Sequence, residues 1–258
     1  MDPSLIVAAF SGALVALLLT LFGGGGSVLA TPLLLYAVGV KDAHVAIGTS
    51  AAAVAANAAV GLVAQARAGR VKWPCALTFG APGLVGSLVG AHLAKAISGK
   101  HLLVGFAVAM AAVGLSMFRA PRSLGDPDVR IDPGRALKLV PIGAATGLAA
   151  SFFGIGGGFL IAPGLMAATG MTLANAAASS LVSVALFGAA TSVSYAVSGF
   201  VNGPLFLALI AGGGVGVFVG ARLAPRLASR GVLARRIFAV MIVATAGYVF
   251  WRAVSGLS

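Results

Sequence analysis

Long apolar stretches separated by short polar joints run through the whole of this chain. They predict helices at about 5–22, 43–65, 74–94 and 102–118 in the first half, and at 138–153, 174–197, 204–221 and 232–251 in the second. A membrane-spanning helix needs about 20 consecutive apolar residues, and no Asp, Glu, Lys or Arg occurs between Lys138 and Arg222. The pattern therefore predicts an all-α polytopic membrane protein with about eight transmembrane helices.

Two shorter apolar segments, 27–39 and 158–169, interrupt this pattern. At 1.5 Å per residue each would reach only about 20 Å, whereas the hydrocarbon core is about 30 Å thick. Each segment follows a glycine cluster and contains a proline, as in Phe22-Gly-Gly-Gly-Gly-Ser-Val-Leu-Ala-Thr-Pro32 and Phe153-Gly-Ile-Gly-Gly-Gly-Phe-Leu-Ile-Ala-Pro163. Lipid cannot satisfy the backbone groups of a broken helix, so such breaks persist only inside protein or beside water. We interpret both as broken, re-entrant helical segments.

Matching residues recur in the same order in the two halves. Gly39 matches Gly170, and Ala43 matches Ala174, which places Ser179 opposite Gly48. After a one-residue shift, Val89-Gly-Ala-His-Leu-Ala94 matches Val219-Gly-Ala-Arg-Leu-Ala224 at five of six positions. We therefore expect an internal duplication, with a first transmembrane repeat at 1–118, a polar linker at 119–137 and a second repeat at 138–258.

The lysines and arginines indicate how the two halves are oriented. If the leading helix and the short segment form a hairpin, each half crosses the membrane an odd number of times and the halves are inverted. One side then holds Arg67, Arg70, Lys72, Arg119, Arg122, Arg130, Arg135, Lys138, Arg222, Arg226, Arg230, Arg235 and Arg236, and the other holds Lys41, Lys95, Lys100 and Arg252. Cytoplasmic loops carry an excess of such residues. We expect inverted repeats in the inner membrane, with both termini on the outer side.

The net charge of +12 therefore reflects topology, and we expect no binding to nucleic acid. The five acidic residues are all aspartates at a terminus or in loops, so a carboxylate proton relay at membrane depth is not expected. His44, His92 and His101 fall near helix ends. The lone Cys75, the absence of a P-loop motif and the absence of metal-ligand clusters predict no enzyme activity, no metal site and no cofactor.

The glycine clusters remain as candidates for a binding site. A helix that begins at about Ser27 or Gly158 offers free N–H groups and a partial positive charge to an anion, and two such breaks in corresponding places indicate a transporter site. The candidate substrate-binding residues are Gly23, Gly25, Gly26, Ser27, Thr31, Thr49, Ser50, Gly154, Gly156, Gly157, Gly158, Asn175, Ser179 and Ser180. The alternative is that glycines only let helices pack closely, and we favour it for Gly86, Gly90, Gly216 and Gly220.

The repeated glycine cluster with its downstream proline is followed by Ala46-Ile-Gly-Thr-Ser50 in one half and Ala177-Ala-Ser-Ser180 in the other. This arrangement resembles the sulfite exporter TauE/SafE family over essentially the whole chain. The resemblance implies a bacterial or archaeal carrier of small sulfur-containing anions, such as sulfite or organosulfonates, usually outward. Gly24 and Ser27 depart from the second copy's pattern, which leaves open whether both halves bind equally.

We therefore expect a secondary membrane transporter that exports small sulfur-containing anions by alternating access and that the membrane potential can drive. Its partners would be the small anion and the lipid bilayer. Two other functions stay open. One is a non-transporting membrane scaffold or assembly factor, and the other is a proton-coupled anion uptake carrier, for which a histidine such as His44 would be essential.

Overall fold

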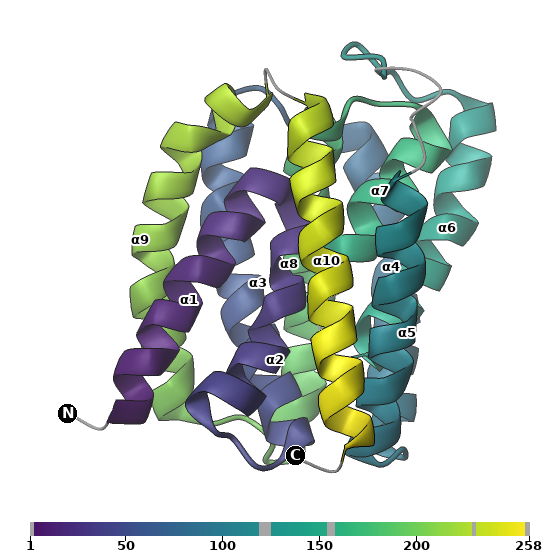
Figure 1. Ribbon diagram of the computed structural model, residues 1–258. Coiled ribbons are helices and arrows are strands. Elements are labelled where there is room, and N and C mark those ends of the chain that lie inside the picture. Colours follow the sequence, from purple (N-terminus) through teal and green to yellow (C-terminus); the bar gives the residue numbers. More distant parts are fainter. Residues whose placement is uncertain (1–2, 119–124, 154–157, 229–230, 256–258) are drawn as a thin grey trace.

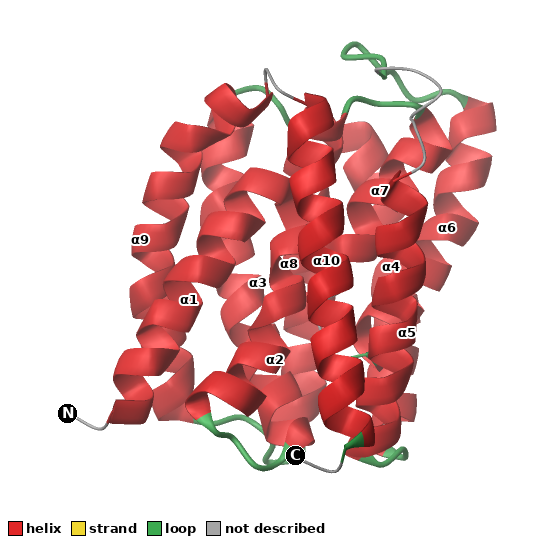
Figure 2. Cartoon of the chain, in the orientation of Figure 1, coloured by secondary structure: helices red, strands yellow, loops and turns green. Residues whose placement is uncertain are grey.

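The computed structural model describes residues 3–118, 125–153, 158–228 and 231–255. The described chain is helical apart from loops at the two edges of the bundle (Figure 2) and one isolated bridge between Asp126 and Met171. The first half contains α1 (Pro3–Phe22), a 3₁₀ turn (Gly23–Leu29), α2 (Ala30–Leu33), a π-helical turn (Leu34–Val38), α3 (Ala43–Arg67), α4 (Trp73–Lys95) and α5 (Gly99–Phe118). The second half contains α6 (Pro133–Phe152), α7 (Gly158–Thr169), α8 (Leu173–Val197), α9 (Gly203–Ala228) and α10 (Gly231–Val254).

Five of these helices are long and apolar enough to cross a membrane by length and composition: α1, α3, α4, α8 and the Gly203–Ala224 part of α9. Shorter apolar helical stretches lie within α5, α7, α10 and the segment Gly26–Val38. The prediction of an all-α polytopic membrane protein is confirmed. Most expected helix limits differ from the observed ones by only a few residues.

Helix α6 is the largest difference at a helix start. It begins at Pro133, five residues before the expected position at 138, and it includes Arg135. Asp132 caps this helix, because its carboxylate accepts a hydrogen bond from the Arg135 backbone N–H at 2.7 Å. Proline at the first helical position fits because its missing N–H would have no partner there. A prediction from hydropathy alone leaves residues 133–137 out of the helix because they are partly polar. The Asp132 cap nevertheless makes the helix begin at Pro133.

The two halves run in opposite directions through the bundle. In Figure 1, α1 begins and α10 ends at the lower edge, which we call the terminal edge. The segment 125–132 and the start of α6 lie at the upper edge, which we call the linker edge. Helix pairing follows the same symmetry: α1 packs on α9 as α4 packs on α6, while α3 pairs with α8 and α5 with α10. The fold is therefore an inverted pair of five-segment halves.

Glycines make the closest helix contacts. A Cβ at Gly86 or Gly90 would overlap backbone atoms of α6, and one at Gly216 would overlap the Ala13 carbonyl of α1. Gly220 packs against the Thr20 side chain of α1. The expectation that these four glycines serve helix packing is confirmed, because small residues let helix backbones approach in the absence of a hydrophobic driving force.

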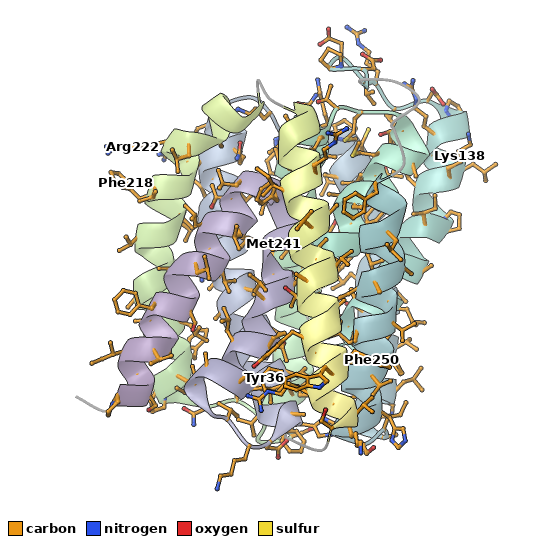
Figure 3. The ribbon with its side chains drawn as sticks, viewed as in Figure 1. Tyr36, Lys138, Phe218, Arg222, Met241 and Phe250 are labelled. Carbon is orange, nitrogen blue, oxygen red and sulfur yellow. The ribbon has the colours of Figure 1, made fainter. Side chains whose placement is uncertain are left out.

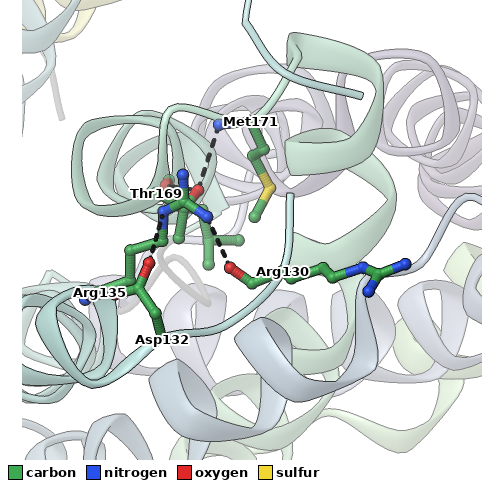
Figure 4. A network of polar contacts seen from close by, with 6 residues as sticks. Arg130, Asp132, Arg135, Thr169 and Met171 are labelled. Atoms are coloured by element: carbon green, nitrogen blue, oxygen red, sulfur yellow. Dashed lines mark hydrogen bonds and ion pairs between the residues drawn. The ribbon is translucent and has the colours of Figure 1, made fainter. Parts of the chain in front are cut away.

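Polar contacts order the segment before α6 and the residues that end α7 (Figure 4). The Arg135 guanidinium donates a hydrogen bond to the Arg130 carbonyl at 2.7 Å and lies 3.5 Å from the Asp132 carboxylate. At the end of α7, the Thr169 hydroxyl accepts a hydrogen bond from the Met171 N–H at 3.2 Å. The two parts are connected by a further hydrogen bond, which the Asp126 N–H donates to the Gly170 carbonyl at 2.9 Å.

Candidate functional site

Helix α1 ends inside the bundle, and the chain then turns back toward the terminal edge (Figure 1). We call residues 23–38 the first broken segment. Gly23 has a φ of +66°, a conformation that glycine adopts without steric cost. Gly26 lies directly on α1, where an added Cβ would overlap the backbone of Leu19. The expected hairpin of α1 and the short segment is therefore present, although Ser27 lies within a 3₁₀ turn and does not start an α-helix.

The break at Gly23 lies against α8 of the other half. A Cβ at Gly23 would overlap the Ala177 carbonyl and would lie 2.5 Å from the Ser180 hydroxyl oxygen. The Ser180 hydroxyl is fully buried and donates a hydrogen bond to the Ala177 carbonyl at 2.8 Å. Helix α7 also packs against the 3₁₀ turn. The exposed backbone of the break is thus enclosed by protein, as a break at membrane depth requires.

Buried hydroxyl groups lie along the first broken segment and on the adjacent helix α3. Ser27, Thr31 and Ser50 are at most 1% exposed. The Thr31 and Ser50 hydroxyl oxygens lie 2.8 Å apart, and the Ser50 hydroxyl donates to the Ile47 carbonyl at 3.0 Å. This pair joins the first broken segment to α3. We call the set Gly23, Gly26, Ser27, Thr31, Ser50 and Ser180 the central cluster.

Three candidate side chains bind loop backbone instead. The Thr49 hydroxyl accepts a hydrogen bond from the Asn202 N–H, and the Ser179 hydroxyl accepts one from the Lys72 N–H, both at 2.9 Å. The Asn175 amide donates to the Pro127 carbonyl at 2.9 Å. The structure therefore places Thr49, Ser179 and Asn175 where they hold the loops at the two edges.

The hydrogen bonds of Thr49 and Ser179 also correct the alignment of the two halves. Each of these hydroxyls accepts a hydrogen bond from a loop N–H of the other half, so the counterpart of Ser179 is Thr49 and not Gly48. The caps agree, since Asp42 caps α3 and Thr172 caps α8. The one-residue shift therefore lies in the loop before these helices, because a loop absorbs a change in length that a packed helix cannot.

The remaining candidates are glycines of the two clusters. Gly25 lies in the 3₁₀ turn, and Gly158 is the first residue of α7. Gly154, Gly156 and Gly157 lie outside the described residues. They therefore stay a prediction.

The sequence analysis did not identify Gln65, which reaches the end of α1. Its amide donates a hydrogen bond to the Thr20 carbonyl at 3.3 Å and accepts one from the Arg70 guanidinium at 3.1 Å. This chain of contacts leads from the basic α3–α4 loop to within three residues of Gly23. The signal in the sequence that could have identified it is that Gln65, the one glutamine of the chain, lies at the end of an apolar helix.

Every buried polar side chain among the described residues is neutral. The set consists of Ser11, Thr20, Ser27, Thr31, Thr49, Ser50, Asn57, Gln65, Ser87, Thr146, Ser151, Thr169, Ser179, Ser180, Ser183 and Thr191. The described residues also contain no group of three His, Cys, Asp or Glu side chains that could hold a metal ion. The interior thus offers hydroxyls, amides and backbone dipoles to a ligand.

Inverted halves that meet at a helix break define a class of membrane transporter in which the binding site lies between the repeats. The chain belongs to the sulfite exporter TauE/SafE family, whose sequence profile matches residues 8–249.

Relatives over the full length have names of the same class. A probable membrane transporter protein of Xylella fastidiosa strain Temecula1 is 45% identical over 258 residues, which cover 98% of each chain. Its counterpart in strain 9a5c is 44% identical over 255 residues, again 98% of each chain. The probable membrane transporter protein YdhB of Bacillus subtilis is 25% identical over 86% of this chain and 90% of its own. No solved structure matches the chain. The protein is a membrane transporter of this family.

Proposed function

We propose that this transporter exports small sulfur-containing anions, such as sulfite or organosulfonates, by alternating access. The observation that carries the proposal is the contact of the Gly23 break with Ala177 and Ser180 of the other half. A ligand bound there touches both halves, so a rocking motion of one half against the other changes the side from which the ligand is reached.

The chemistry of the central cluster suits an anion with several oxygen atoms. The Ser50 and Ser180 hydroxyls donate to the Ile47 and Ala177 carbonyls, and each would turn its O–H toward such an oxygen when the anion binds, because hydrogen bonds to a charged partner are about twice as strong as neutral ones. Backbone N–H groups of the broken helix add donors where the two halves separate during alternating access. A neutral, donor-rich site suits a small pyramidal or tetrahedral oxyanion.

The membrane potential supplies the driving force for export. With a negative interior, each exported charge gains about 2.3 kcal/mol per 100 mV. The buried polar side chains of the described residues are neutral, which is consistent with transport that needs no proton carrier inside the bundle. Basic residues such as Arg67, Arg70 and Lys138 gather near the linker edge and would raise the local anion concentration if that edge faces the cytoplasm.

The test is efflux of labelled sulfite from liposomes that contain the purified protein, under an imposed potential and without a pH gradient. We expect saturable efflux that follows the potential. Ser180→Ala should raise the KM about tenfold, because a hydrogen bond to a charged group contributes about 1.5–3 kcal/mol. Ser87→Ala is the matched control, since its buried hydroxyl also donates to the carbonyl three residues earlier, Leu84, but on α4.

The outcomes separate the competing functions. Equal kinetics in Ser180→Ala and Ser87→Ala would contradict a site at the central cluster. Flux that begins only when a pH gradient is added, and that His44→Gln abolishes, would indicate proton-coupled uptake. Absence of flux for sulfite, taurine and sulfoacetate under every gradient would favour a non-transporting scaffold.

A further inference from the structure

A charged cavity opens at the terminal edge, on the opposite side of the bundle from the linker. Its volume is about 630 Å³, and six titratable side chains line it: Tyr36, Lys41, Asp42, His44, Lys100 and Arg252. They come from the first broken segment, the start of α3, the start of α5 and the end of α10. Figure 3 shows Tyr36 beside α10 near this edge. We call this space the terminal-edge cavity.

Positive charge exceeds negative charge in its wall. Lys41, Lys100 and Arg252 face a single carboxylate, that of Asp42. This carboxylate caps α3 by accepting a hydrogen bond from the His44 backbone N–H at 2.7 Å. Neither lysine forms an ion pair with a carboxylate of the described residues. The cavity therefore keeps a net positive charge.

Aromatic side chains orient Arg252. Its Nε donates a hydrogen bond to the Tyr248 hydroxyl at 3.2 Å, and its guanidinium carbon lies 5.2 Å from the centre of the Tyr36 ring. The rings of Tyr36 and Tyr248 meet edge to face, with centres 5.4 Å apart. Such cation–π contacts orient a guanidinium. A fixed arginine is the group that proteins favour for binding oxyanions.

Two buried polar atoms at this cavity have no hydrogen-bond partner among the described residues. They are the Tyr36 hydroxyl and the Nδ1 atom of His44, and both residues line the cavity. A buried polar group without a partner costs about 1–3 kcal/mol, so natural structures rarely leave one unsatisfied. A ligand that accepts a hydrogen bond from Tyr36 would remove this cost.

Two long helices also begin at the cavity wall. Helix α3 starts at Ala43 and helix α5 at Gly99, and a Cβ at Gly99 would lie 2.6 Å from the Ala43 Cβ. The two N-termini therefore touch. The Asp42 carboxylate caps α3 by accepting a hydrogen bond from the His44 N–H, whereas α5 contributes about half a positive charge and first-turn N–H groups without a partner inside the helix, which add to the charges of Lys41 and Lys100.

From these observations we propose that the terminal-edge cavity is a binding site for one small oxyanion of the sulfate, sulfite or sulfonate class, held by Arg252, Lys100, Lys41 and the Tyr36 hydroxyl. Binding at this cavity does not depend on the function proposed above. The further role of the cavity, as the last binding site that an exported anion occupies before it leaves at the terminal edge, rests on that function.

The test is equilibrium binding of [³⁵S]sulfate to the purified protein in a neutral detergent, at constant ionic strength set with chloride. We expect a saturable binding component of one site per chain that depends on the cavity residues. Tyr36→Phe should weaken this component about tenfold without lowering the melting temperature, because the hydroxyl has no hydrogen-bond partner among the described residues. Arg252→Gln and Lys100→Gln should weaken it at least as much. The charge-matched control Lys138→Gln, at the linker edge, should leave it unchanged.

Three results would overturn the assignment. They are the absence of saturable binding, wild-type affinity in both Tyr36→Phe and Lys100→Gln, or an equal loss in Lys138→Gln. An anionic lipid headgroup presents the same oxyanion chemistry, so binding is repeated in nanodiscs of phosphatidylcholine with and without phosphatidylglycerol. Sulfate binding that phosphatidylglycerol abolishes would assign the cavity to lipid and overturn the free-anion proposal.

The two proposals fail separately. Saturable sulfate binding that depends on Tyr36, without flux in liposomes, would leave the cavity site standing and remove the proposed export. Normal sulfite efflux without any sulfate binding at the terminal edge would leave the proposed export standing and remove the cavity site.

Discussion

Gly23 carries two constraints that make it different from most glycines of the chain. Its φ of +66° lies in the left-handed region, and it also touches the Ala177 backbone and the Ser180 hydroxyl of α8. Gly199 shares the conformation, with a φ of +78°, but has open space where a Cβ would lie. A comparison of substitutions at Gly23 and Gly199 therefore separates the effect of backbone strain from the effect of the contact between the two halves.

We predict that Gly23→Ala lowers the melting temperature more than Gly199→Ala does and abolishes sulfite efflux. An L-residue in the left-handed region costs about 1–2 kcal/mol, which both variants share, whereas only Gly23→Ala forces α8 away from the break. Differential scanning fluorimetry and liposome efflux on both proteins measure this. If the two variants melt alike and both transport, the contact between the break and α8 has no functional role.

The hydroxyl pair Thr31–Ser50 joins the first broken segment to α3, with its oxygens 2.8 Å apart in the buried interior. We predict a coupling of about 0.6 kcal/mol in a double-mutant cycle of Thr31→Val and Ser50→Ala, the size measured for hydrogen bonds between membrane helices. Reversible unfolding of the four proteins in mixed micelles gives the coupling. Additive effects would show that the pair does not hold the segment.

At the level of elements, neighbouring glycines of α9 have different surroundings. A Cβ at Gly212 would overlap the Ala9 backbone of α1, whereas one at Gly214 would meet nothing within 4 Å. Close approach of α1 and α9 therefore depends on one of these positions and not on the other. The same type of contact joins α4 and α6, where Gly147 lies on the Gly83 carbonyl.

We predict that Gly212→Ala lowers stability by about 1–3 kcal/mol, the usual cost of overpacking a well-packed interior. Gly214→Ala should leave stability unchanged or raise it slightly, since alanine is the better helix former. Thermal unfolding of both variants against the wild type tests this. Equal loss in the two would mean that α9 is sensitive to any substitution rather than to the α1 contact.

At the level of the whole molecule, the two edges of the bundle differ in charge. The linker edge carries Arg67, Arg70, Lys72, Arg130, Arg135 and Lys138, whereas the terminal edge carries Lys41, Lys95, Lys100 and Arg252. The excess of lysine and arginine favours a cytoplasmic linker edge. The start of α1 and the end of α10 then face the outside.

We predict that an impermeant maleimide labels Ser255→Cys on intact cells and labels Lys138→Cys only after the membrane is opened. Both positions are exposed, and the only native cysteine, Cys75, is buried and can be replaced by alanine as background. The opposite labelling pattern would reverse the orientation. It would also place the terminal-edge cavity on the cytoplasmic side.

Several features of this molecule follow from local chemistry and could be predicted from the sequence. Apolar runs predicted the helices, because each span must satisfy its own backbone in lipid. The glycine clusters predicted where a helix breaks, and loop charges predicted the inverted arrangement. The start of α6 was missed, since hydropathy does not register the cap formed by Asp132.

The site was predicted only in part. The sequence identified the glycine break and its nearby hydroxyls, but it could not separate Ser180, which lies at the break, from Ser179, which binds the Lys72 N–H on another face of the same helix. Adjacent helical residues point in directions about 100° apart, given 3.6 residues per turn. Only packing decides which of the two faces the other half.

The terminal-edge cavity depends on the tertiary structure alone. Lys100 and Arg252 are far in the chain from Tyr36 and Lys41 and from each other, and no spacing or motif connects them. The sequence by itself determined which segments are helices, where they break and how charge is divided between the loops, because these follow from backbone hydrogen bonding and transfer into lipid. The folded bundle decided which side chains meet, because the contacts of a helix depend on the neighbours packed around it.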